Sequence, residues 1–286
     1  MRIETGELLA DRAELRVALL ADTDELGVTS SRVAPGFPAP PLHVHDRHAD
    51  CFLVLGGAVL LELEGEERVV EPQSWIQVPE GIVHTFSAAG TEPTRFVNVH
   101  APSSGLGTYM RALLAAKTDD DRRRAWDAFD ARAATIGLDP GPVVVRRLGG
   151  EEGETITERP GRRVTLLSDT EELAVTDSVY GPGERGPDDH VHREHADAWF
   201  VLEGSLVFRL RDDVVFEAHA GTFVVVPPNI VHAFSNESET TTRFLNIHAP
   251  SCGFGAYLRG QNDDFDQHDP PADGGADPGG ALVRTF

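Results

Sequence analysis

Lysine, cysteine and long apolar runs are nearly missing from this chain of 286 residues. The chain has 25 basic residues, of which one is a lysine, Lys117, and 47 acidic residues, so its formal net charge is −22. Such an acidic surface repels phosphate backbones and anionic lipids, which argues against nucleic acid and against membranes as partners. The acidic opening MRIETGELLADRAEL has no long apolar run. We therefore expect neither a signal peptide nor a transmembrane span.

The two cysteines, Cys51 and Cys252, do not form a disulfide framework. They stand at non-equivalent positions of the internal repeat described next. A structural disulfide would be expected in both copies of a duplicated domain or in neither. We therefore predict two reduced thiols and a cytoplasmic protein, since the cytoplasm keeps thiols reduced.

One octapeptide occurs twice: HVHDRHAD at 43–50 returns as HVHREHAD at 190–197. Four further segments align at a similar offset: 16–29 with 163–176, 51–63 with 198–210, 95–111 with 243–259, and 139–148 with 277–286. The chain is therefore an internal duplication. We predict two domains, 1–148 and 149–286, each long enough to bury its own core.

The local patterns predict an all-β fold. Short runs such as VLLELEG, SWIQVP and TRFVNVH are rich in branched and aromatic residues and are broken by Gly, Pro and Asp. Repeated short strands of this kind are typical of sandwiches and barrels. Between the domains, residues 105–117 and 120–136 have helical spacing, with Asp119–Asp121 as a start signal and Gly137 as a stop. We expect a helical connector over about 105–136, and a shorter counterpart at 253–269. The apolar segments 143–148 and 281–286 could pair within their own barrel or with the other.

The histidines of the octapeptide suit a metal site. Residues i and i+2 of a strand face the same way, so His43 and His45 point into one interior. A carboxylate five residues later lies past a short turn, and a His inside a Pro-x-x-x-x-His segment follows 34 or 35 residues after it. The expected ligands are His43, His45, Asp50 and His84 in one domain and His190, His192, Asp197 and His232 in the other. Such a set leaves coordination positions open, which favours catalysis, and it suits Fe, Mn, Ni, Co or Zn, up to two ions per chain.

These residues resemble the cupin superfamily. Its first motif, G-x5-HxH-x4-E-x6-G, is matched around His43 and His190 except that the leading Gly is Phe37 or Glu184 and the Glu is an Asp. Its second motif, G-x5-PxG-x2-H-x3-N, is matched in most positions around His84 and His232. The resemblance covers nearly the whole chain. It implies a bicupin, that is, two tandem jelly-roll barrels in one chain.

The chain departs from the motifs in ways that leave one ligand open. The metal-binding Glu is replaced by Asp50 and Asp197, which are one methylene shorter. His48 and His195, two residues earlier, could take that place, or could hydrogen-bond a ligand from behind. In the second motif a Gly is replaced by Gln73 in the first copy, and another by Asn229 in the second. Asn tolerates the positive φ that such a turn requires.

Several further residues are candidates for the pocket. Phe52, Phe86, Trp199 and Phe234 each follow a ligand by two residues, and the alternative for each is ordinary core packing. Asn98 and His100 share one strand face, as do Asn246 and His248. If that face is inward, they could orient a substrate or carry a proton. The preferred alternative for the two histidines is a strand end near the surface.

The resemblance implies an enzyme of the quercetinase-like kind. Such a dioxygenase binds an enol or catechol-like small molecule at the open metal position and adds O2, with Asp50 or Asp197 as the base. A redox-neutral isomerase, epimerase or decarboxylase is the first alternative. A non-catalytic metal or small-molecule binding protein is the second. Homodimers are common among similar proteins.

Overall fold

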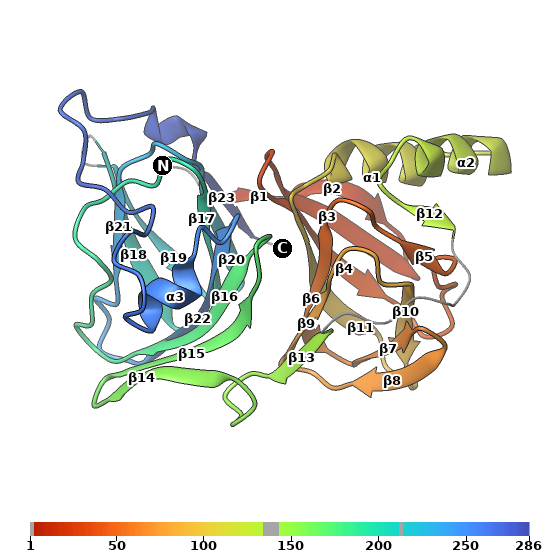
Figure 1. Cartoon of the computed structure of the whole chain (residues 1–286). Coiled ribbons are helices and arrows are strands. Elements are labelled where there is room, and N and C mark those ends of the chain that lie inside the picture. Colours follow the sequence, from red (N-terminus) through yellow and green to blue (C-terminus); the bar gives the residue numbers. More distant parts are fainter. Residues whose placement is uncertain (1–2, 134–142, 212–213, 286) are drawn as a thin grey trace. The chain divides into compact units, whose positions relative to one another are not determined.

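The structure is a computed structural model that describes residues 3–133, 143–211 and 214–285. The chain forms two compact units (Figure 1). One unit is Gly6–Gly150, and the other consists of Glu151–Phe286 together with the N-terminal residues Met1–Thr5. Strand β1 (Glu4–Thr5) pairs in parallel with β23 (Leu282–Thr285), and Glu4 forms an ion pair of 2.9 Å with Arg284. The repeat did not predict that the first residues would belong with the C-terminal half.

The unit of Gly6–Gly150 has two antiparallel sheets. The seven-stranded sheet follows the order β13-β9-β6-β11-β4-β3-β2 and the five-stranded sheet the order β12-β5-β10-β7-β8. The strands are β2 Glu7–Asp11, β3 Leu15–Asp22, β4 Gly27–Val33, β5 His43–Val44, β6 Ala49–Gly56, β7 Ala58–Leu63, β8 Glu66–Val70, β9 Ser74–Val78, β10 His84–Ala89, β11 Thr94–Ala101, β12 Arg132–Ala133 and β13 Val144–Arg147.

The other unit repeats this plan. Its eight-stranded sheet follows the order β1-β23-β20-β17-β22-β16-β15-β14, and a three-stranded sheet the order β19-β18-β21. The remaining strands are β14 Glu154–Arg159, β15 Arg162–Asp169, β16 Ala174–Tyr180, β17 Ala196–Glu203, β18 Ser205–Leu210, β19 Val214–His219, β20 Thr222–Val226, β21 His232–Ser235 and β22 Thr242–Ala249.

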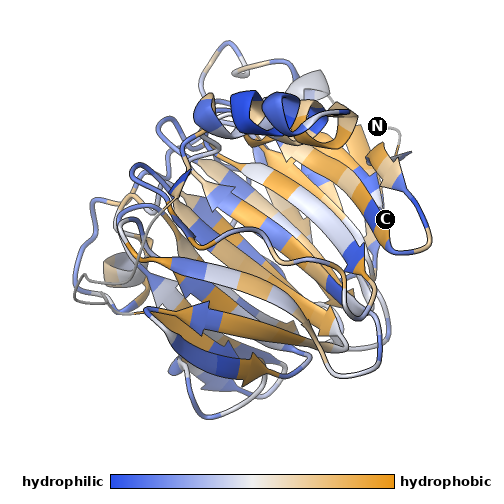
Figure 2. Cartoon of the chain, turned by 90° about the vertical axis from the view of Figure 1, so that its right-hand side faces the viewer, coloured by the Kyte–Doolittle hydropathy of each residue, from blue (hydrophilic) through white to orange (hydrophobic). Residues whose placement is uncertain are grey.

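Apolar side chains fill the interior of each unit. They are frequent along the strands, as the orange bands in Figure 2 show, and strands such as β9 and β20 are buried at every position. Phe52, Leu61 and Ile76 are fully buried in the first unit, and Trp199 and Phe208 in the second. Burying such a side chain stabilises the fold by roughly 1.5–3 kcal/mol. The predicted all-β, duplicated fold is confirmed.

The helices lie outside the sheets. They are α1 Leu106–Ala115, α2 Asp119–Asp127, α3 Phe254–Leu258 and the 3-10 turn Pro278–Gly280. Helix α2 begins with a capping box in which Thr118 and Asp121 exchange hydrogen bonds. The predicted extent of the second connector helix, 120–136, was wrong, because α2 ends at Asp127 and the chain becomes strand β12. Burial of Phe129 and Asp130 draws the chain out of the helical path. The predicted stop at Gly137 lies outside the described residues.

The terminal segments of the repeats pair within their own units. Strand β13 lies beside β9, and β23 beside β20. This decides a choice that the sequence had left open. Cys51 is buried and Cys252 partly exposed, and the two are not joined by a disulfide. In the part of the chain that the structure describes, no helix is long and apolar enough to cross a membrane.

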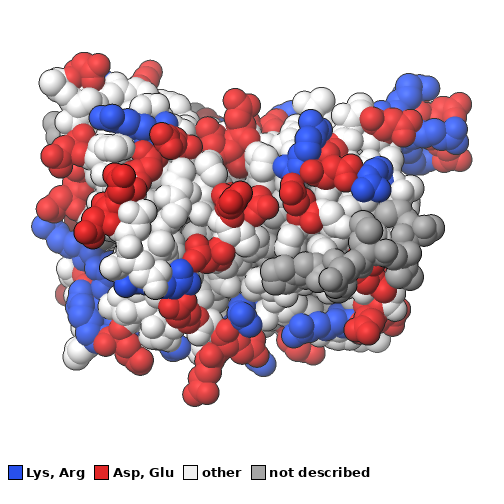
Figure 3. Space-filling model, in the orientation of Figure 1, with Lys and Arg blue, Asp and Glu red and all other residues white. Residues whose placement is uncertain are grey.

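Charged side chains cover the surface without a broad basic area on the face drawn in Figure 3. Several arginines of the described chain are paired with carboxylates: Arg259 contacts Glu154 and Asp169, each at 2.6 Å, and Arg111 contacts Glu7 at 2.6 Å. Exposed pairs of this kind add about 0–1 kcal/mol each.

Candidate metal centres

Each unit gathers three histidines and one aspartate at one end of its interior. In both sets the ligand atoms lie within 4.8 Å of one another, and all four side chains are buried. The sets are His43, His45, Asp50 and His84, and His190, His192, Asp197 and His232. Strand pairing brings them together, because His43 is opposite His84 and His190 is opposite His232. These are the eight residues that the sequence predicts as ligands.

All six histidines present the same ring nitrogen to the centre. Each Nδ1 lies 2.5–2.9 Å from a main-chain carbonyl oxygen. A carbonyl only accepts, so Nδ1 carries the proton and the lone pair of Nε2 is available. Four of these carbonyls, those of Pro41, Ile82, Asp188 and Ile230, belong to the residue two positions before the histidine. Those of Asp130 and Asp266 lie far away in sequence.

Several of the inward Nε2 atoms make no hydrogen bond to the protein. Those of His45, His192 and His232 are buried without a hydrogen bond to any described residue. An unsatisfied buried polar atom costs about 1–3 kcal/mol. Burial and the neighbouring histidines also lower the pKa of His43 and of His190 to about 3, so both rings are neutral. Imidazoles that direct Nε2 at one point beside a carboxylate are the donors that a divalent cation requires, so the residues fit a metal ion.

The aspartate of each set is oriented by hydrogen bonds from residues outside the set. Asp50 Oδ1 accepts from Asn98 Nδ2 at 2.5 Å and from His100 Nε2 at 3.2 Å, and its Oδ2 lies 3.2 Å from His84 Nε2. Burial would raise the pKa of Asp50, but the charges and hydrogen bonds of His100, His45 and His84 outweigh burial and hold that pKa well below its usual range. Asp197 has the same surroundings, with Asn246 donating to it. Both groups are therefore carboxylates.

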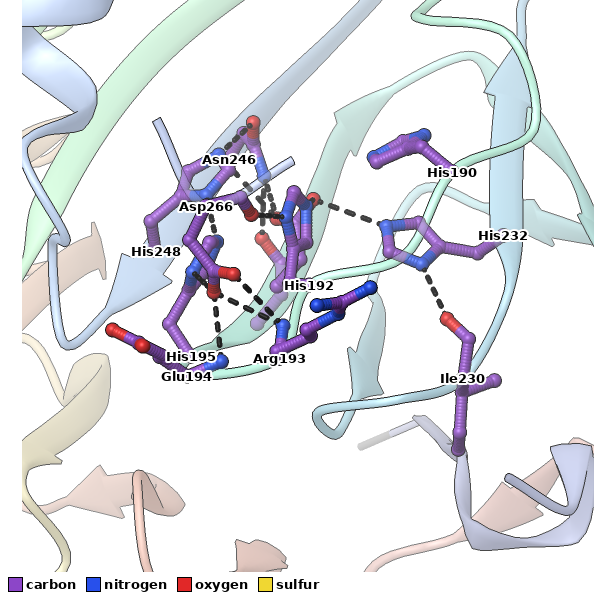
Figure 4. A network of polar contacts seen from close by, with 12 residues as sticks. His190, His192, Arg193, Glu194, His195, Ile230, His232, Asn246, His248 and Asp266 are labelled. Atoms are coloured by element: carbon purple, nitrogen blue, oxygen red, sulfur yellow. Dashed lines mark hydrogen bonds and ion pairs between the residues drawn. The ribbon is translucent and has the colours of Figure 1, made fainter. Parts of the chain in front are cut away.

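His48 and His195 lie beside the sets. His195 Nδ1 lies 2.8 Å from Asp266 Oδ2, and His195 Nε2 lies 2.9 Å from His248 Nδ1 (Figure 4). His195 also belongs to two further groups within 4.8 Å, one with His192 and His248 and one with Cys252 and Asp266. His48 Nδ1 lies 2.9 Å from Asp130 Oδ2. These hydrogen bonds of both histidines therefore go to residues outside the two predicted ligand sets.

The strand pairs Asn98–His100 and Asn246–His248 face inward. His100 and His248 are 4% and 3% exposed, so the preferred alternative of a strand end near the surface was wrong. The register explains this outcome, because His100 is opposite Asp50 and His248 is opposite Asp197. Each histidine therefore shares a strand face with a carboxylate of the set.

The four predicted aromatic residues lie mainly in the core. Phe52 and Trp199 are fully buried, Phe86 packs on Phe52, and Phe234 packs on Trp199. Ordinary packing therefore accounts for most of their surface. Trp199 also approaches His232, with ring centroids 5.7 Å apart, and Phe234 borders an outer hollow of about 410 Å³.

Other aromatic residues, which the sequence did not single out, cover the histidines. Phe129 lies 6.0 Å from His45 and 5.5 Å from His48, and Phe265 lies 5.7 Å from His192, measured between ring centroids. Each is followed by an aspartate, Asp130 or Asp266. A signal did exist: Asp-x-Phe-Asp occurs at 127–130 and again at 263–266. Its offset is 136 rather than 148, because the connector is longer in the first unit, and an alignment without gaps misses it.

A family model described as "Cupin domain" matches residues 30–100 and 177–248, one stretch in each unit. The chain belongs to the cupin family. Quercetin 2,3-dioxygenase of Bacillus subtilis (strain 168) is 25% identical over 256 residues, which are 80% of this cupin and 74% of that protein.

Solved structures of Bacillus subtilis oxalate decarboxylase share the fold. One, at pH 4.6, has a TM-score of 0.53 and 18% identity over 87% of this chain and 73% of that chain. Another, which concerns its Mn(II) centres, has a TM-score of 0.54 and 16% identity over 93% and 82%.

The departures from the cupin motifs preserve the backbone. Gln73 and Asn229, which replace glycines of the second motif, have φ of 58° and 68°. Gly81 and Gly221, the residues at the corresponding positions of the other copies, have φ of 79° and 86°. The expectation that Asn229 keeps a positive φ is confirmed. The turns before His84 and His232 therefore keep their shape although the residues differ.

Proposed function

We propose that this cupin is a metal-dependent dioxygenase that acts with O2 on an enol or catechol-like small molecule of the flavonol type. The observation that carries the proposal is the convergence of three histidine Nε2 atoms and one carboxylate in both units. Similarity to a quercetin 2,3-dioxygenase over 80% of the chain supports the reaction class.

The proposed ligands are His43, His45, Asp50 and His84, with their counterparts in the second unit. A divalent transition metal bound there supplies Lewis acidity and holds both reactants together. Manganese is a reasonable choice, since Mn(II) centres are described for oxalate decarboxylase, a protein of the same fold. Iron, nickel, cobalt and zinc suit the same donors.

Side chains of the protein can accept the proton that a substrate hydroxyl loses. Asp50 and Asp197 are ionised, and we propose that each accepts the proton of a substrate hydroxyl. Asn98 and Asn246 fix the carboxylates by donating to Oδ1, so Oδ2 remains directed at the histidines. Phe129 and Phe265 cover the histidines and reduce the access of water, which strengthens electrostatic interactions within the site.

Two arginines on segments that carry site residues already have carboxylate partners. Arg47 pairs with Asp130, and its side chain is 71% exposed. Arg243, on the strand of Asn246, pairs with Asp177 at 2.7 Å. Both guanidinium groups are thus occupied by other carboxylates. The redox-neutral decarboxylase stays the main competitor, and it needs no O2.

The first test is metal content per chain by elemental analysis, on the native protein and on His43→Ala and His190→Ala. We expect about two equivalents, with half lost in each variant. O2 uptake and CO2 release are then measured with a flavonol, a catechol and oxalate. Uptake with the first two supports the dioxygenase, and O2-independent CO2 release from oxalate supports the competitor. If the protein contains no metal after expression in metal-supplemented medium, the enzyme proposal fails and a non-catalytic small-molecule binding protein is the remaining interpretation.

A further inference from the structure

We propose that Asp130 and Asp266 are positioning residues of the two centres. Each holds one ligand histidine in the tautomer and orientation that a metal ion needs, from a segment outside both histidine motifs. The inference rests on the proposed function, since it assumes that the histidines bind a metal.

One ligand histidine in each unit depends on a distant partner. His43 and His84 bond to a carbonyl two residues away, so their own strands fix their rings. His45 Nδ1 instead lies 2.6 Å from the carbonyl oxygen of Asp130, 85 residues later. His192 Nδ1 lies 2.5 Å from the carbonyl oxygen of Asp266, 74 residues later. Without this carbonyl either ring nitrogen of these histidines could carry the proton, and a ring protonated at Nε2 would face the ion with an N–H.

The aspartate carboxylate anchors the carbonyl in place. Asp266 accepts from the backbone N–H of Arg193 at 3.0 Å and of Glu194 at 2.7 Å, and it lies 2.8 Å from His195 Nδ1 (Figure 4). These groups follow His192 directly. The carboxylate therefore ties its own segment to the loop that carries the ligand, and the side chain and main chain of one residue act together.

The first unit repeats the arrangement. Asp130 accepts from the backbone N–H of Arg47 at 2.8 Å and lies 2.9 Å from His48 Nδ1. Asp130 and Asp266 are 8% and 9% exposed, so water competes little for these bonds. The segments that carry Asp130 and Asp266 differ in length and sequence, yet both aspartates make the same contacts with the histidine loop of their unit. We infer that these contacts position the ligand histidines.

The test compares Asp266→Ala with Asp264→Ala, an exposed aspartate two residues earlier. Both are made in a His43→Ala background, so that the C-terminal centre alone is measured. We expect Co²⁺ to bind 10–100-fold more weakly to Asp266→Ala, as is usual when a group that orients a ligand is lost, and within threefold of the parent to Asp264→Ala. Asp130→Ala in a His190→Ala background should behave likewise at the other centre.

A second readout uses the metal-free protein. Long-range ¹H–¹⁵N NMR spectra of the imidazole rings report which nitrogen carries the proton. We expect Nδ1–H for His192 in the native protein and a mixture of tautomers in Asp266→Ala. Asp266→Asn keeps the side-chain volume and one oxygen acceptor. This variant is used if Asp266→Ala does not fold. We expect it to change the His192 tautomer ratio in the same direction but by less.

The outcomes separate the two proposals. Weaker Co²⁺ binding together with a tautomer mixture supports the positioning role. Native Co²⁺ affinity, or an unchanged His192 tautomer, in a folded Asp266 variant overturns it while the metal function stands. If the native protein binds no Co²⁺, the proposed function fails. The tautomer spectra then still decide whether Asp266 orients the ring.

Discussion

The carboxylate in each centre has two oxygens with separate surroundings. Asp197 Oδ1 accepts from Asn246, whereas Oδ2 lies 3.6 Å from His192 Nε2 and 3.5 Å from His232 Nε2. Asp is shorter than the Glu of the family motif, so it has less freedom to find an ion by rotation. The asparagine that fixes it therefore determines where the oxygen points.

We predict that Asn246→Ala weakens Co²⁺ binding at the C-terminal centre by roughly tenfold, because Asp197 loses the donor that orients it. Titration of the variant in a His43→Ala background measures this. The matched control is Asn236→Ala, which removes another buried asparagine that bonds to main-chain oxygens away from the centre. The control should lower stability and leave Co²⁺ affinity within threefold. Equal affinities in the two variants would contradict the prediction.

Residue spacing was sufficient to predict which side chains gather in each centre, but not the groups that hydrogen-bond to them. His43 and His45 are two apart on a strand, and His84 follows a proline turn, so local rules bring them together. Asp130 contacts His45 only because the connector folds back over the first unit, and the local sequence pattern does not predict where the connector goes. His100 was misjudged for the same reason, since its burial depends on its register with β6.

Helix α2 shows how tertiary contacts override helix propensity. The spacing of 120–136 favours a helix, yet Trp126 at its end lies 5.4 Å from His43 and Phe129 lies 4.2 Å from Tyr109, between ring centroids. Continuing the helix would remove Phe129 from that stack. The apolar contacts of one aromatic residue, roughly 2 kcal/mol, exceed the propensity of the few residues that leave the helix.

The capping box at the start of α2 gives a test of this element. Thr118→Ala removes the hydroxyl that accepts from Asp121 N at 3.1 Å, so we expect the Gly6–Gly150 unit to lose about 1 kcal/mol of unfolding free energy. Urea denaturation followed by tryptophan fluorescence measures it, with Thr91→Ala, an exposed threonine of the same unit, as control. Co²⁺ affinity should stay unchanged. A loss of affinity would mean that the start of α2 helps to hold the centre.

Buried histidines make the stability of the whole metal-free protein depend on pH. The pKa is about 3 for His43 and His190 and about 4 for His195, chiefly because of burial. In the unfolded chain each is about 6.5. Between these values the unfolded state binds more protons, so the stability that is complete above about pH 6.5 is lost as pH falls. The pKa of His45 is raised, because Asp50 and Asp130 outweigh burial, and this one group acts in the opposite direction.

We therefore expect the metal-free protein to be less stable at pH 5 than at pH 7, by up to about 1.4 kcal/mol per pH unit for each net proton taken up. Urea denaturation at both values measures the difference. The double variant His43→Gln, His190→Gln should show a shallower dependence, and His219→Gln, an exposed histidine, should match the native protein. Equal stability at both pH values would count against neutral buried rings.

Each centre draws its ligands, its asparagine and its aspartate from a single unit. One translated chain therefore yields two complete copies of the site in a fixed ratio. If both centres bind metal as proposed, damage to one copy would remove half of that metal and leave the second copy whole. Inactivation of one centre by substitution should therefore lower the activity rather than abolish it.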